Sequence, residues 1–143
     1  MRFILDANVW ISYLLARDES NTIRQLIGVC TNSAHTIIAP PELLHELRAS
    51  IGKYPHLRKR ITQEQIELLT QTILEIAFQP DSLQRELAQV SRDPKDDYLI
   101  AYALVYRADY LVTGDDDLLV LGAIEQLRIV RPAEARFVGR RLM

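Results

Sequence analysis

The chain has 143 residues, of which 48% are hydrophobic and 25% charged, and its formal net charge is −2. These values are typical of one globular domain and exclude a disordered or low-complexity chain. The single cysteine, Cys30, excludes an internal disulfide and lies in an apolar segment, so we interpret it as a buried structural thiol. The three histidines are scattered without the spacing of a zinc site.

The N-terminal sequence lacks the architecture of a signal peptide, because Asp6 interrupts the first apolar run. No stretch approaches the roughly 18 uncharged apolar residues of a membrane span. We therefore expect a cytoplasmic protein with no membrane partner.

The first half of the chain alternates patterns typical of strands and helices. The predicted elements are a strand over 2–5, helices over 8–17 and about 20–31, a strand over 35–39, and helices over 41–50 and 62–77. Pro41 suits the first position of its helix, and Gly52 and Pro55 end it. Thr62 and Gln65 form a possible capping box.

The second half opens with residues 78–92, whose pattern is ambiguous. The elements predicted after it are a helix over 96–107 with Asp93 as its cap, a strand over 110–113, a short helix from Asp116 and a strand over 127–130. The helix over 96–107 is apolar on most sides, so we expect it to be central.

Strands alternating with helices predict one α/β domain over residues 1–143, with a mainly parallel sheet. In such sheets ligands bind beyond the carboxyl ends of the strands. Asp6 directly follows the first predicted strand, and Asp115 follows the strand over 110–113 after one glycine. This coincidence is the first indication of a functional site.

Each carboxylate also has a structural interpretation. Asp6 could cap the following helix, although Asn8 could do so as well. Glu46 could be an ordinary surface acid, but it lies nearer than Glu42 to the apolar face of its helix. Glu46 could therefore point into a cleft, whereas we expect Glu42 to face water.

Two further acidic clusters follow. Asp93, Asp96 and Asp97 crowd a helix start, which is more acid than capping requires, and we take Asp97 as the candidate ligand with Asp96 behind it. The second cluster, Asp115, Asp116 and Asp117, could be a solvated turn. Three acids after a buried strand are nevertheless costly without a nearby positive charge.

No single acid indicates a metal site by itself, but the acids from four separate segments do so together. Such hard oxygen ligands suit Mg²⁺ or Mn²⁺, and Thr113 could add a hydroxyl. Residues 53–60 are basic and could contact phosphates or form a plain solvated loop.

The order of these acids resembles the PIN-domain nucleases. The matching stretches are residues 3–9, 41–47, 92–103 and 108–119, and the chain is similar to the VapC-like toxin components of toxin–antitoxin pairs. The resemblance implies a three-layer α/β/α fold with a five-stranded parallel sheet. It also implies Mg²⁺- or Mn²⁺-dependent cleavage of single-stranded RNA, a small antitoxin as partner and a homodimer.

Carried over by position, the family's acids fall on Asp6, Glu46, Asp97 and Asp115, with Asp117 as an accessory. The polar positions beside them fall on Asn8 and Thr113. Asp96 and Asp116 add neighbouring carboxylates, so the ligand in each cluster is uncertain by one residue. In this interpretation the cation activates a water molecule for attack on the phosphate.

Two other functions fit parts of the pattern. A metal-dependent phosphatase with Asp6 as nucleophile would want an aspartate two residues later, where this chain has Asn8. A PIN fold can also serve as a catalytically silent RNA- or protein-binding module when its acids are lost, but here they are retained.

Overall fold

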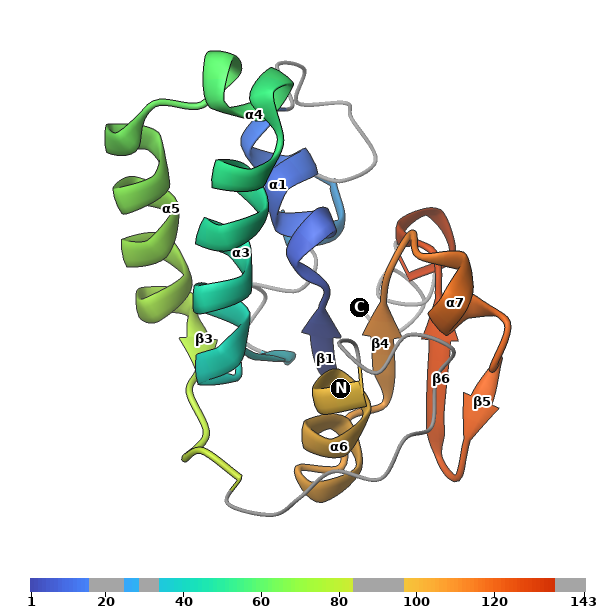
Figure 1. Cartoon of the computed structure of the whole chain (residues 1–143). Coiled ribbons are helices and arrows are strands. Elements are labelled where there is room, and N and C mark those ends of the chain that lie inside the picture. The colour runs from blue at the N-terminus through green and yellow to red at the C-terminus, as the bar shows by residue number, and fades with distance from the viewer. Residues whose placement is uncertain (16–24, 29–33, 84–96, 136–143) are drawn as a thin grey trace.

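A computed structural model describes residues 1–15, 25–28, 34–83 and 97–135 (Figure 1). The strands are β1 (Arg2–Leu5), β2 (Thr36–Ile38), β3 (Ala77–Phe78), β4 (Tyr110–Val112), β5 (Ala123–Ile124) and β6 (Leu127–Val130). The helices are α1 (Ala7–Leu15), α3 (Pro41–Lys53), α4 (Pro55–Arg60), α5 (Gln63–Ile76), α6 (Asp97–Val105) and α7 (Asp116–Leu119). Residues 25–28 are also helical.

The strands form one mixed sheet in the order β3-β2-β1-β4-β6-β5. All neighbouring strands are parallel except β5 and β6, so the predicted mainly parallel sheet is confirmed. The described sheet has six strands rather than the expected five. Strands β3 and β5 have two residues each, which is too short to give an alternating pattern.

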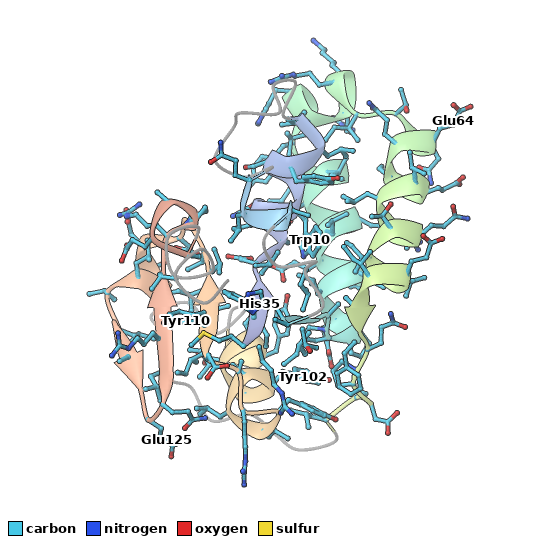
Figure 2. The ribbon with its side chains drawn as sticks, turned by 180° about the vertical axis from the view of Figure 1, so that it is seen from behind. Trp10, His35, Glu64, Tyr102, Tyr110 and Glu125 are labelled. Atoms are coloured by element: carbon cyan, nitrogen blue, oxygen red, sulfur yellow. The ribbon has the colours of Figure 1, made fainter. Side chains whose placement is uncertain are left out.

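Successive side chains of each central strand enter different cores. In β1, Phe3 and Leu5 pack with helices α1, α3 and α5, whereas Ile4 packs with α6 and α7. This follows from the two-residue period of a strand, and it explains why these strands read as continuous apolar runs. Trp10 belongs to the first core and Tyr102 to the second; both are labelled in Figure 2. The result is the predicted three-layer α/β/α arrangement.

Most predicted elements lie where the sequence placed them. The capping box of Thr62 and Gln65 is present, and Pro41 occupies the first turn of α3. The interpretation of residues 53–60 as a plain solvated loop is wrong. Helix α3 ends at Lys53, and Pro55 opens the short helix α4. Leu57 anchors this short helix, since its side chain is buried among the residues of the first core.

Several expectations lie outside the described residues. They are the buried thiol of Cys30, the cap Asp93, the accessory acid Asp96 and most of the predicted helix over 20–31.

Candidate functional site

The site begins where β1 and β4 end. Leu5 and Val112 are register partners in these parallel strands, and the backbone N–H of Asp6 donates to the carbonyl oxygen of Val112 at 3.0 Å. Thr113 directly follows β4, and its own N–H donates to the carbonyl oxygen of Val130 in β6 at 3.0 Å. Asp6 and Thr113 therefore leave the centre of the sheet side by side, at its carboxyl end.

The Thr113 side chain joins two of the acids. Its hydroxyl donates to Oδ2 of Asp6 at 2.7 Å and accepts from the backbone N–H of Asp115 at 3.0 Å. Asp115 in turn caps α7, because its Oδ1 accepts from the N–H of Asp117 at 2.9 Å. Thr113 is fully buried and Asp6 is 2% exposed, so the hydrogen bond between them is shielded from solvent.

The electrostatics of Asp6 are unfavourable for a free carboxylate. Burial raises the pKa of Asp6, and the charge of Asp115 raises it further. The Thr113 hydroxyl and the backbone of Ala7 and Asn8 lower this pKa by hydrogen bonding, but they do not cancel the rise. Because Asp6 directly precedes α1, it also fills the capping position that the sequence allowed as its ordinary role.

A second group of candidates lies between α3 and α6. Asp97 is the first residue of α6 and is 4% exposed. The neighbouring Tyr98 donates its hydroxyl to Oε2 of Glu46 on α3. This bond ties the half-buried Glu46 carboxylate to the first turn of α6, where Asp97 lies. Glu46 is thus half-buried at the edge of the apolar face of α3, as its position in the sequence predicted.

The expectation that Glu42 faces water is wrong. Its side chain is half-buried, and Oε1 accepts a hydrogen bond of 2.9 Å from the Tyr102 hydroxyl. Tyr102 also accepts from the N–H of Leu83 at 2.9 Å. The physical reason is that a buried tyrosine hydroxyl needs a partner, and α6 brings Tyr102 against α3.

Glu42 and Glu46 are four residues apart on α3, and their partners Tyr102 and Tyr98 are four residues apart on α6. The two pairs form a ladder between the helices, which we call the Tyr–Glu ladder. Neither tyrosine was predicted as part of the site from the sequence. Their i,i+4 spacing, matched to that of the two glutamates, was the available signal.

The remaining candidates have diverse surroundings. Asp116 is directed outward, where its Oδ1 lies 3.3 Å from Nη2 of Arg131 in an exposed ion pair. Asn8 is exposed, and its backbone contacts Asp6. Asp117 is half-buried in α7, where its N–H binds Asp115. Within residues 1–15, 25–28, 34–83 and 97–135, no group of three acid, histidine or cysteine side chains is already arranged to hold a metal ion.

Comparison with protein families bears directly on this arrangement. The profile of the PIN domain matches residues 2–117. The chain belongs to the PIN-domain family. PIN domains are generally nucleases, and the match spans Asp6, Glu46, Asp97 and Asp115. No curated protein matches the chain. In the part of the chain that the structure describes, no helix is long and apolar enough to cross a membrane.

PIN domains typically use divalent metal ions, and the residues of this PIN domain fit such an ion in their chemistry. The donors are carboxylate oxygens with a neighbouring hydroxyl, the set that Mg²⁺ and Mn²⁺ prefer. The charge of Asp115 contributes to the raised pKa of Asp6. A cation between them would reverse this effect, because it favours the charged form of both.

Proposed function

We propose that this PIN domain is a Mg²⁺- or Mn²⁺-dependent endoribonuclease that hydrolyses single-stranded RNA. The observation that carries the proposal is the buried Asp6 carboxyl at the end of β1, held by Thr113 and near the charge of Asp115. A buried acid beside a second acid destabilises the fold unless a positive charge joins them. Membership of a family of nucleases supports the reaction class.

We propose that Asp6, Asp97 and Asp115 hold the cation, with Asp117 as an accessory. When bound, the cation supplies Lewis-acid polarisation of the scissile phosphate and a lower pKa for an adjacent water. Thr113 fixes the orientation of the Asp6 carboxylate through its hydrogen bond. Glu46 orients the attacking water or helps to hold a second cation. We propose Asn8, Asp96 and Asp116 as accessory residues.

The proposed reaction is an in-line displacement at phosphorus. The water oxygen forms a bond to phosphorus while the bond between phosphorus and the 3′ oxygen breaks. The water loses a proton, and the departing 3′ oxygen gains one, which leaves a 3′-hydroxyl and a 5′-phosphate. Because water is the nucleophile, the chemistry requires no catalytic serine, cysteine or histidine.

The test is cleavage of a mixed pool of single-stranded and structured RNA with Mn²⁺, Mg²⁺ or a chelator. Asp6→Asn is the matched variant, since it keeps the side-chain shape and removes the charge. Glu125→Gln removes one exposed acid at the turn between β5 and β6, far from the carboxyl ends of the strands (Figure 2). It controls for net charge and for contaminating ribonucleases.

We expect metal-dependent cleavage by the wild type and by Glu125→Gln and none by Asp6→Asn. Cleavage of the same rate in all three preparations would contradict the proposal. Absence of cleavage together with retained RNA binding would favour the catalytically silent binding module.

We further propose that the enzyme acts in the cytoplasm as the toxin of a toxin–antitoxin pair, as a homodimer and with a small antitoxin protein as partner. The support is its resemblance to VapC-like proteins over residues 3–119. Induced expression of the wild type should arrest bacterial growth, whereas Asp6→Asn should not. Normal growth on expression of a soluble, RNA-cleaving wild type would refute the toxin role.

A further inference from the structure

A pocket outside the carboxylate site lies between α3, α4 and the start of α5. Its volume is about 290 Å³, and two arginines, Arg48 and Arg58, line it. Ile51, Ile61 and Ile66 also line the pocket, and all three are buried. The lining of the pocket therefore combines apolar side chains with two cationic groups.

The charge around this pocket is strongly segregated. Residues 47–63 contain no acid and five basic residues, which are Arg48, Lys53, Arg58, Lys59 and Arg60. The rest of the chain carries 12 basic and 19 acidic residues. Among the described residues, neither Arg48 nor Arg58 has an ion pair or a hydrogen bond to its guanidinium. Both guanidiniums are thus available to a ligand.

We propose that this pocket binds a nucleotide of single-stranded RNA outside the catalytic centre. The guanidinium fork of arginine matches phosphate oxygens in a bidentate geometry. The three isoleucines offer an apolar surface to the attached sugar or base. Beside the pocket, the Tyr54 ring is 44% exposed and Lys53 Nζ lies 5.7 Å from its centre. An exposed aromatic beside basic residues is typical of surfaces that bind single strands.

The position of the pocket fits an extended substrate. Figure 1 shows α4 at the end of the molecule toward which β1 and β4 point, beyond the ends of these strands. Asp6 and Thr113 directly follow these strands, so an RNA strand that continues from the carboxylates in this direction has its flanking nucleotides on the side of α4. The two acids that flank this segment, Glu46 and Glu64, do not line the pocket, and Glu64 projects from the outer end of α5 (Figure 2).

RNA fits this pocket better than an acidic protein segment, and the inference rests on the proposed ribonuclease function. The catalytic acids repel a polyanion, so the affinity for RNA must come from basic surface elsewhere. The described residues 47–63 are the densest basic segment that the structure offers for this purpose.

The experiment measures binding apart from cleavage. A labelled single-stranded RNA is titrated with Asp6→Asn protein in a chelator, and fluorescence anisotropy gives Kd at several salt concentrations. The test variant adds Arg48→Gln and Arg58→Gln. The matched control adds Arg107→Gln and Arg128→Gln, two exposed arginines that do not line the pocket.

We expect the test variant to bind about tenfold more weakly than the control, the loss expected for one or two charge-assisted hydrogen bonds. The slope of log K against log salt should fall by about 0.7 for each phosphate that the variant no longer binds. Equal Kd values and equal slopes in test and control would overturn the inference and leave the pocket to an acidic protein partner. A failure of the ribonuclease proposal is recognised separately, because it appears as absent cleavage by the wild type.

Discussion

Replacing Thr113 by valine tests how the acids are held. Valine keeps the shape of the side chain and removes the hydroxyl, which joins Asp6 Oδ2 at 2.7 Å to the N–H of Asp115 at 3.0 Å. A hydrogen bond to a charged group contributes about 1.5–3 kcal/mol, and one between neutral groups about 0.5–1.5 kcal/mol. Because Thr113 and Asp6 are both buried, water cannot replace the bond between them, whereas the Asp115 N–H is only partly buried. We expect the free energy of unfolding to fall by about 2–4 kcal/mol.

For a domain of this size, 1 kcal/mol shifts Tm by about 3 °C, so thermal unfolding followed by circular dichroism should show a Tm lower by roughly 10 °C. Thr113→Ser should recover most of this loss. Thr72→Val is the matched control, since its hydroxyl binds only the Leu68 carbonyl of its own helix, and it should change stability by less than about 0.5 kcal/mol. A Thr113→Val protein as stable as the wild type would refute the reasoning.

Three further predictions concern Asp6, Tyr98 and His35. Because burial raises the pKa of Asp6, ionisation of this side chain destabilises the fold as the pH rises above 3.8. The metal-free Asp6→Asn protein should therefore resist denaturant better than the wild type at pH 7 but not at pH 3. Tyr98→Phe, which removes the hydrogen bond from Tyr98 to Glu46, should slow RNA cleavage about tenfold, more than the matched Tyr102→Phe does; equal rates would contradict a positioning role. Burial lowers the pKa of His35, so stability should fall as pH drops below 6.5, and His35→Phe should lose this dependence in denaturant titrations.

The sequence predicted the central part of the fold because that part carries strong patterns. The strands β1, β2 and β4 contain consecutive buried apolar residues, β6 is interrupted only by the exposed Arg128, and α5 begins with a complete capping box. The edge strands β3 and β5 were missed because two residues show no period and owe their conformation to their neighbours. The short helix α4 was missed because its charges resemble those of a loop, while Leu57 alone anchors it.

The candidate site was predictable to the extent that it follows strand ends. Asp6 and Thr113 lie together because parallel strands end at one edge, which the sequence pattern already implied. The partners of Glu42 and Glu46 were not predictable in the same way. They depend on how α6 packs on α3, and a helix that is apolar on most sides does not reveal which side meets a given neighbour.

The measurement that tests the central claim most directly is a calorimetric titration of the protein with Mn²⁺, in parallel for wild type, Asp6→Asn and Glu125→Gln. The claim is that Asp6 and Asp115 form a cation site at the carboxyl ends of β1 and β4. We predict saturable binding to the wild type and to Glu125→Gln and at least a tenfold loss of affinity in Asp6→Asn. Equal affinity in all three proteins, or no binding to a folded wild type, would contradict the account.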